Sequence, residues 1–283
     1  MAMLRNLLNS DFLFKKRRTM HHEGSPILKT TGLGMSFNGD SALIDVNFEL
    51  NKGEQIAVVG PNGAGKSTLF KIVAGVLKPT AGEVYIAGHE PGGHICIAYI
   101  PQRSQVDWNF PVSVSDVVMM GRIGKIGLFR HPSRNDWQFV MDSLEVVGLS
   151  DLAGRQIGEL SGGQQQRMFI ARALAQEAEL MLMDEPLTGL DVPSLEDIFQ
   201  ILISLQRQQV TVMIAMHDLK IAADHFKKVM LLNRKVIKIG PPDQVFDAQT
   251  LKLAYGDHVH LVPTEEGMLA MDDACCDDED ERP

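Results

Sequence analysis

The segment 60–68 constrains this chain more than any other feature, because its sequence GPNGAGKST matches the pattern G-x-x-x-x-G-K-[ST]. An apolar run at Gln55–Val59 predicts a strand before it, and helical spacing over residues 66–76 predicts a helix after it. In that setting backbone N–H groups curl around phosphate oxygens at a helix N-terminus. An ordinary glycine-rich turn seldom supplies Lys66 and Ser67 at these places, so we expect a phosphate-binding loop.

The phosphate-binding loop predicts a bound nucleoside triphosphate with Mg²⁺. We expect Lys66 to reach the β- and γ-phosphates and the Ser67 hydroxyl to ligate Mg²⁺. The residues assigned to nucleotide binding are Gly60, Pro61, Asn62, Gly63, Ala64, Gly65, Lys66, Ser67 and Thr68.

Two adjacent acids end a second apolar run, residues 180–183. A buried strand of this kind delivers carboxylates to its C-terminal edge. Asp184 is the candidate Mg²⁺ partner, directly or through water, and Glu185 is the candidate base that polarises the attacking water. Two acids at a strand end can also be solvated turn residues, but beside a phosphate-binding loop the catalytic interpretation is favoured.

The rest of the chain alternates β-branched runs with helical periodicity, which predicts an α/β sheet flanked by helices. A helix-rich stretch at about 111–172 is expected as an insertion between strands. Ile44, Val46, Phe48 and Leu50 alternate with polar residues and predict a half-buried strand. Further expected strands are 84–86, 95–100, 211–215 and 229–232, and expected helices are 114–120, 135–147, 164–175, 194–207 and 219–225.

Composition excludes several classes of protein. No apolar run approaches the roughly 20 residues that span a bilayer. The apolar residues of the N-terminal segment precede its basic ones, which is the wrong order for a secretory signal, so we expect a cytoplasmic protein. The 3 Cys (Cys96, Cys275 and Cys276) are too few for a disulfide framework. The 27 Lys and Arg against 36 Asp and Glu give a net charge of −9, which gives no support for a nucleic-acid partner.

Three regions are expected along the chain: an N-terminal extension at 1–24, a folded domain at 25–263 and an acidic tail at 264–283. Both ends are interpreted as disordered. A membrane-surface role for the basic, partly apolar extension stays open. His89, His94 and Cys96 lack the spacing of a tetrahedral metal site, so we expect a solvated hairpin there.

Residues 160–167 read LSGGQQQR, which resembles the signature of ATP-binding cassette (ABC) ATPases, and the resemblance extends over about residues 27–240. It implies an α/β P-loop NTPase cassette with a RecA-like core, an antiparallel β subdomain and a helical subdomain at about 103–172. Ser161 and Gln164 also form a capping-box pattern at a helix start, whose N–H groups can bind phosphate. In the resembled family two cassettes close head to tail over two ATP molecules. Ser161, Gly162, Gly163 and Gln164 would then face the nucleotide of the second copy.

The resemblance also implies roles for single residues outside the two motifs. Gln102 is similar to the glutamine that contacts Mg²⁺, and His217 to the switch histidine that contacts the γ-phosphate. Asp191 matches the loop that contacts the partner cassette, although Thr188-Gly189 stands where many relatives have Ser-Ala. Phe37 resembles the aromatic that stacks on adenine, a position where Tyr is commoner; a buried core Phe is the alternative.

Residues 102–111 and 115–122 resemble the ATPases of importers for manganese, zinc and iron, and 121–124 favour the manganese branch. Trp108 and Phe110 could equally fill a core. The resemblance implies separate membrane permease subunits, a metal-binding protein outside the cell, and a location on the inner face of the plasma membrane. The alternatives are a soluble ABC ATPase of macromolecular assembly, such as iron-sulfur cluster biogenesis, and a regulatory cassette that binds ATP without useful turnover. The second is disfavoured because every catalytic position is filled.

Overall fold

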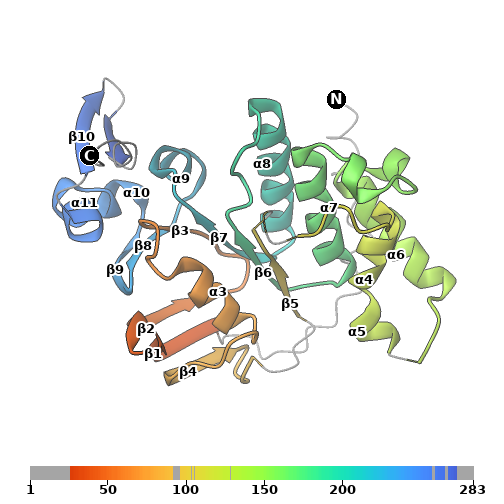
Figure 1. The fold of residues 1–283 in the computed structure, drawn as a ribbon, viewed down its shortest axis with the longest axis horizontal. Coiled ribbons are helices and arrows are strands. Elements are labelled where there is room, and N and C mark those ends of the chain that lie inside the picture. Colours follow the sequence, from red (N-terminus) through yellow and green to blue (C-terminus); the bar gives the residue numbers. More distant parts are fainter. Residues whose placement is uncertain are drawn as a thin grey trace, which may run out of the picture.

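The computed structural model describes residues 26–91, 96–102, 104, 106–127, 129–256, 259–264 and 267–272. The centre of this part is a six-stranded sheet in the order β5-β6-β7-β3-β8-β9 (Figure 1). Its strands pair in parallel except β9, which is antiparallel to β8. Their bounds are β3 Gln55–Val59, β5 Ile97–Ile100, β6 Leu180–Asp184, β7 Thr211–Met216, β8 Val229–Asn233 and β9 Lys235–Gly240. β6 and β7 are buried along their whole length, which explains the apolar runs 180–183 and 212–216.

A second, antiparallel sheet has the order β2-β1-β4, from strands β1 Leu28–Phe37, β2 Asp40–Leu50 and β4 Ala81–Ile86. Asn38 and Gly39 both have positive φ and form the two-residue turn between β1 and β2. The register of this hairpin shifts between Leu33 and Met35. The expected alternation is therefore wrong at its first residue: Ile44 is 47% exposed, and its neighbour Leu43 faces the core. Asp45, in a left-handed conformation at φ 48, marks the break.

Successive residues of the central strands face two different cores. Val58 and Leu182 pack with α3 (Lys66–Val73) and the antiparallel sheet. Val59 and Met183 pack on the opposite face. That face is covered by α7 Gly162–Ala175, α8 Val192–Arg207, α9 Leu219–His225, α10 Pro242–Val245 and α11 Ala248–Tyr255. α3 and α7 thus lie on opposite faces of the sheet (Figure 1).

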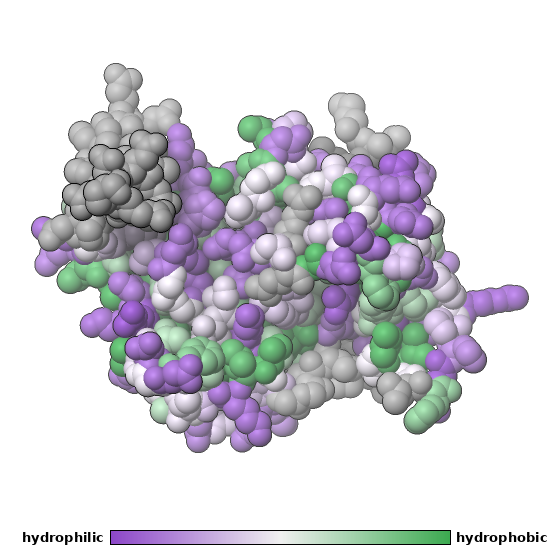
Figure 2. Space-filling model, in the orientation of Figure 1, coloured by the Kyte–Doolittle hydropathy of each residue, from purple (hydrophilic) through white to green (hydrophobic). Residues whose placement is uncertain are grey.

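The expected helix-rich insertion lies between β5 and β6, and α7 continues it to Ala175. Before α7 it contains α4 Val114–Met120, α5 Ile123–Ile126, α6 Arg134–Val146 and the 3₁₀ turns η2 Ser150–Leu152 and η3 Ile157–Glu159. Ser113 and Ser133 open α4 and α6 with capping boxes. Hydrophobic side chains reach the surface around α5 (Figure 2), among them Met120 at 41% and Ile123 at 51% exposed. In the part of the chain that the structure describes, no helix combines the length and apolarity needed to cross a membrane.

Several boundaries differ from the sequence expectation. The helix expected over 66–76 ends at Val73, and Gly75 follows with positive φ. The expected end of the folded domain at residue 263 falls inside β10 (Val259–Thr264). That strand pairs with β11 (Gly267–Asp272), which falls in the expected acidic tail 264–283. The extension 1–24, Cys275 and Cys276 lie outside the described residues.

Candidate nucleotide-binding site

Four loops meet at the carboxyl edge of the central sheet. The parallel register aligns Ile100 of β5 with Met183 of β6, and Val59 of β3 with Met216 of β7. Asp184 pairs with Ala215, one residue before the end of β7. The loop 60–68, Gln102, Glu185 and His217 all follow these strand ends. The structure therefore brings the sequence-predicted loop, carboxylates, glutamine and histidine to one edge, where α/β sheets bind ligands.

The phosphate-binding loop is held tightly from behind. A Cβ atom on Gly60 would overlap the carbonyl oxygen of Leu232, and one on Gly65 would lie 2.5 Å from the carbonyl oxygen of Ala42. Gly65, at φ 93, is the N-cap of α3. Lys66 Nζ donates to the carbonyl oxygens of Gly60 (2.7 Å) and Pro61 (3.1 Å). The glycines therefore leave a cradle in which the backbone curls around the ammonium group at a helix N-terminus.

The exposure of the loop residues fits this arrangement. Ala64 and Lys66 are buried, and Asn62 and Gly63 are exposed at the outer side of the loop. Burial lowers the pKa of Lys66, and the nearby carboxylates of Glu185 and Asp184 oppose that shift. The ammonium group of Lys66 thus lies between the loop carbonyls and the carboxylates of Glu185 and Asp184. There its positive charge can neutralise the negative charge of a polyphosphate.

Two side-chain pairs supply oxygen ligands beside the loop. Ser67 Oγ donates to Asp184 Oδ1 at 3.0 Å, and Asp184 is 1% exposed. Gln102 Nε2 donates to Glu185 Oε2 at 3.0 Å. A hydroxyl, carboxylates and an amide oxygen are the hard ligands that Mg²⁺ prefers, so the residues present fit this ion.

Glu185 has an unusual backbone conformation. Its φ is 49, and its N–H donates to the carbonyl oxygen of Ala215 at 3.1 Å. A left-handed conformation at a residue with a Cβ is costly and persists only where the surrounding structure holds it. Here it turns the Glu185 carboxylate away from the path of β6, toward Gln102.

His217 and Phe37 are more exposed than Ala64 and Lys66 of the phosphate-binding loop. His217 is exposed directly after β7, and Asp218 caps α9 by accepting from the N–H of Ile221. Phe37 is 45% exposed at the end of β1, beside the Asn38-Gly39 turn. The alternative of a buried core Phe is therefore wrong, and the exposed part of the Phe37 ring is accessible from outside the fold.

Ser161 to Gln164 lie away from the loop, because they open α7 on the opposite face of the sheet from α3. Ser161 Oγ accepts from the N–H of Gln164 at 3.4 Å, and Gln164 Oε1 accepts from the N–H of Ser161 at 3.0 Å. A Cβ on Gly163 would overlap the Ser194 hydroxyl, and Asp191 accepts from the Ser194 N–H at 3.2 Å. The segment 161–164 therefore packs against Ser194, which in turn donates its backbone N–H to Asp191.

Two residues with structural connections to the site were not assigned by the sequence. Tyr99 of β5 donates its hydroxyl to Asp184 Oδ2 at 3.2 Å. A tyrosine in a buried strand usually needs a partner for its hydroxyl, and this was the available signal. The second is Arg122, which enters the sequence analysis only as part of the segments 115–122 and 121–124 that resemble the metal importers.

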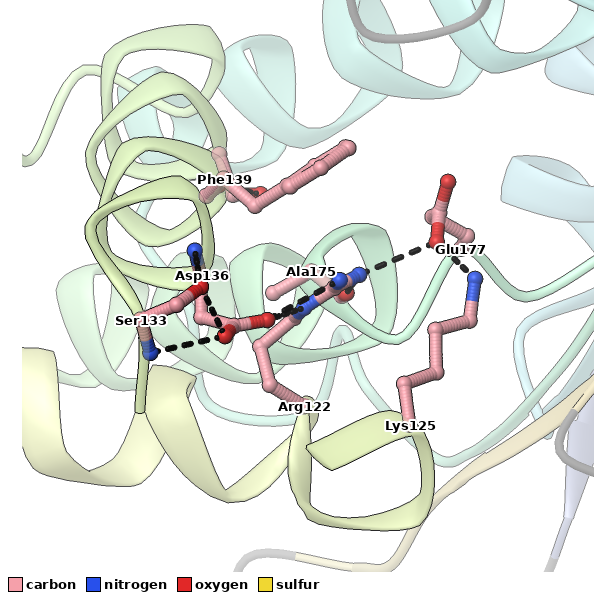
Figure 3. Close-up of polar contacts among 8 residues, drawn as sticks. Arg122, Lys125, Ser133, Asp136, Phe139, Ala175 and Glu177 are labelled. Atoms are coloured by element: carbon pink, nitrogen blue, oxygen red, sulfur yellow. Dashed lines mark hydrogen bonds and ion pairs between the residues drawn. The ribbon is translucent and has the colours of Figure 1, made fainter. Parts of the chain in front are cut away.

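Arg122 joins three helices of the insertion (Figure 3). It is 5% exposed and donates to Asp136 Oδ1 at 3.2 Å, to Glu177 Oε2 at 3.0 Å and to the carbonyl oxygen of Ala175 at 3.0 Å. Its guanidinium lies 4.3 Å from the ring centroid of Phe139. Arg122 thereby ties the end of α4 to α6 and to the C-terminus of α7, the helix whose N-terminus is the signature segment.

Potential transition-metal ligands do not gather elsewhere in the described residues, where no group of three or more His, Cys, Asp or Glu is placed to hold a metal. His89 Nδ1 lies 3.1 Å from the carbonyl oxygen of Ala87 in the turn after β4. Cys96 is buried, and burial raises the pKa of its thiol to about 11. His94 lies outside the described residues.

The chain has clear relatives. A family model described as ABC transporter matches residues 43–188. The chelated iron transport system membrane protein YfeB of Yersinia pestis is 45% identical over 234 residues, 80% of this chain and 79% of that protein. The manganese transport system ATP-binding protein MntB of Halalkalibacterium halodurans is 42% identical over 231 residues, 82% of this chain and 92% of that protein.

The fold comparison agrees with these sequence relatives. A solved inward-facing ABC transporter assigned to the metal-chelate type superposes with a TM-score of 0.75 at 30% identity. The match covers 88% of this chain and 99% of that chain. The antiparallel sheet, the central sheet and the helical insertion are therefore the parts of a known architecture. With its phosphate-binding loop, carboxylate strand and signature helix in place, the chain belongs to the ABC transporter family as one of its ATP-binding cassettes.

Proposed function

We propose that this chain is the ATP-hydrolysing subunit of an importer for divalent metal ions, with manganese the favoured cargo and zinc or iron the alternatives. ATP hydrolysis is supported chiefly by two hydrogen bonds, Ser67 to Asp184 and Gln102 to Glu185. Both lie at the sheet edge that bears the phosphate-binding loop. The similarity to YfeB, a chelated iron transport protein, and to MntB, a manganese transport protein, supports the cargo.

ATP would bind with its phosphates in the loop 60–68 and its adenine on Phe37. Backbone N–H groups and the ammonium of Lys66 bind the β- and γ-phosphates. Mg²⁺ supplies charge neutralisation of the phosphates when bound, held by Ser67, Gln102 and Asp184. Glu185 accepts a hydrogen bond from the attacking water, and His217 donates one to the γ-phosphate.

A second copy of the chain would complete the site. The signature residues and the loop lie on opposite faces of the sheet in one chain, so Ser161 cannot reach the nucleotide held by its own Lys66 without a large rearrangement. The exposed start of α7 and the exposed Asp191 favour a head-to-tail pair in which each signature segment faces the partner's γ-phosphate.

The permease subunits would dock on the helical insertion. Met120, Ile123 and Trp137 are 41%, 51% and 42% exposed, and they flank the contact between Arg122 and Asp136. An exposed apolar surface of this kind suits a protein partner (Figure 2). Docking there would hold the cassette at the inner face of the plasma membrane, with the extracytoplasmic metal-binding protein acting only through the permease.

The function is tested by ATP turnover of the purified chain and of Glu185→Gln, with Glu159→Gln, an exposed acid, as the matched control. We expect Glu185→Gln to bind ATP and to hydrolyse it about 100-fold to 10,000-fold more slowly, as loss of a general base does. Unchanged hydrolysis would reject Glu185 as the base. Sedimentation separates the two function classes: a transporter subunit sediments with membranes that contain its permease, and a soluble assembly ATPase stays in the supernatant.

A further inference from the structure

The carboxylate of Asp184 is held by two donors from two different elements. Ser67 Oγ, on α3, donates to Oδ1 at 3.0 Å, and the hydroxyl of Tyr99, on β5, donates to Oδ2 at 3.2 Å. Asp184 itself is 1% exposed. Each carboxylate oxygen therefore has its own partner, and rotation of the carboxylate about its Cβ–Cγ bond would break both hydrogen bonds.

The strand register explains how Tyr99 reaches this position. Tyr99 pairs with Leu182 in the parallel β5–β6 ladder, and Asp184 follows Leu182 by two residues on the same face of β6. A diagonal neighbour at this separation is within reach of a long aromatic side chain. The ring of Tyr99 packs at the edge of the core that contains Leu182, so its position is fixed by packing as well as by the ladder.

Tyr99 is the donor in this contact, because a phenol has one O–H group to donate and Asp184 Oδ2 lies 3.2 Å from it as the acceptor. A hydroxyl that donates to a carboxylate oxygen makes a charge-assisted hydrogen bond, which is stronger than a bond between neutral groups.

We propose that Tyr99 is a positioning residue for the Mg²⁺ of the nucleotide: by holding Asp184 Oδ2, it directs Oδ1 toward Ser67 and the metal. Groups that hydrogen-bond to a metal ligand fix its orientation and raise its affinity for the metal. This inference rests on the proposed ATP–Mg²⁺ site and deepens it. It predicts that the hydroxyl of Tyr99 matters to metal binding and not to binding of the nucleotide alone.

The test compares wild type with Tyr99→Phe, which keeps the ring and its packing and removes only the hydroxyl. Tyr85→Phe is the matched control, because Tyr85 also donates to a carboxylate, Glu83 Oε2 at 2.8 Å, but does so on the antiparallel sheet. Asp184→Asn reports on the metal site itself. The probe is Mn²⁺, whose binding is followed by electron paramagnetic resonance in the presence of a non-hydrolysable ATP analogue. Affinity for the same analogue is measured in EDTA, and thermal melting checks the fold.

We expect Tyr99→Phe to weaken Mn²⁺ binding about tenfold, the lower end of the usual effect of losing such a partner. Analogue affinity in EDTA and the melting temperature should match Tyr85→Phe. Wild-type Mn²⁺ affinity in Tyr99→Phe, together with a loss in Asp184→Asn, would overturn the inference and leave the proposed function standing. Unchanged Mn²⁺ affinity in Asp184→Asn would reject the metal site, and this inference with it. If Tyr99→Phe weakened analogue binding in EDTA by the same factor as Mn²⁺ binding, the inference would also be overturned, because Tyr99 would then act on the fold.

Discussion

Gln102 Nε2 donates to Glu185 Oε2 at 3.0 Å, and this hydrogen bond joins the loop after β5 to the end of β6. Gln102 stands where the chain leaves the central sheet for the helical insertion. Glu185 is the proposed base. The position of the insertion and the orientation of the Glu185 carboxylate are therefore linked through one side-chain contact.

The first prediction concerns this contact. Gln102→Ala removes a hydrogen bond to a charged group, which contributes about 1.5 to 3 kcal/mol, so ATP turnover should fall about tenfold to 100-fold. Binding of ATP in EDTA should be unchanged, because Gln102 is not part of the phosphate cradle. Steady-state phosphate release and equilibrium binding measure the two effects. A loss of binding equal to the loss of turnover would contradict the assignment.

The exposed ring of Phe37 gives a second prediction. Phe37→Ala should weaken ATP affinity by about 1 to 3 kcal/mol, the usual value of base–aromatic stacking. Phe37→Tyr should bind like wild type. Ile44→Ala, which removes another exposed apolar side chain from the same antiparallel sheet, serves as the control for stability and binding. Equal ATP affinity in Phe37→Ala and wild type would remove Phe37 from the site.

Two glycines of the phosphate-binding loop should respond differently to the same substitution. A Cβ at residue 60 meets the Leu232 backbone, which cannot move aside cheaply, so Gly60→Ala should cost more than about 3 kcal/mol of unfolding free energy or prevent folding. Gly63, at φ 77, has open space around it, and Gly63→Ala should cost only the left-handed strain of about 1 to 2 kcal/mol. Urea unfolding measures both. Equal costs would contradict this description of the loop.

The ion pairs of Arg122 with Asp136 and Glu177 predict a pH-dependent contribution to the stability of the fold. Burial tends to raise the pKa of Asp136, but hydrogen bonds from Ser133 and Arg122 outweigh it and hold the pKa below the ordinary 3.8. Because the folded-state pKa is the lower one, this stabilisation is complete above about pH 4 and is lost as the pH falls through the folded-state value.

Asp136→Asn should therefore lower the unfolding free energy by about 2 kcal/mol at pH 7, since it leaves Arg122 buried with one acid fewer. The difference from wild type should shrink below pH 4. Asp142→Asn, a partly exposed acid on the same helix that accepts a hydrogen bond from Gln138, should change stability by less than about 0.5 kcal/mol. A wild-type advantage that stays constant down to pH 3 would contradict the role of the Asp136 charge.

The local motifs predicted most of the elements that form the candidate site. A strand, loop and helix at 55–73 follow from residue types whose effects are local, and the parallel register then places the ends of β5, β6 and β7 beside them. The phase of β2 was predicted wrongly at Ile44, because a register shift depends on how two strands fit and leaves no periodic signal.

Contacts between distant residues were the least predictable part. Tyr99 and Asp184 are 85 positions apart, and Arg122 and Glu177 are 55 apart. Which donor meets which carboxylate is decided by packing of the whole domain. Strand β11 was missed for a related reason: Gly267–Asp272 becomes a strand by pairing with β10, while its own sequence adjoins an acidic run.

The most direct test of the transport account is uptake of radiolabelled Mn²⁺ and Zn²⁺ by cells that carry wild-type protein or Glu185→Gln at equal abundance. The account predicts that Glu185→Gln abolishes uptake of one metal, manganese being favoured, and leaves the other at the background level of cells without the protein. Uptake of both metals at the wild-type rate in Glu185→Gln cells would contradict the proposal that ATP hydrolysis by this chain drives their import.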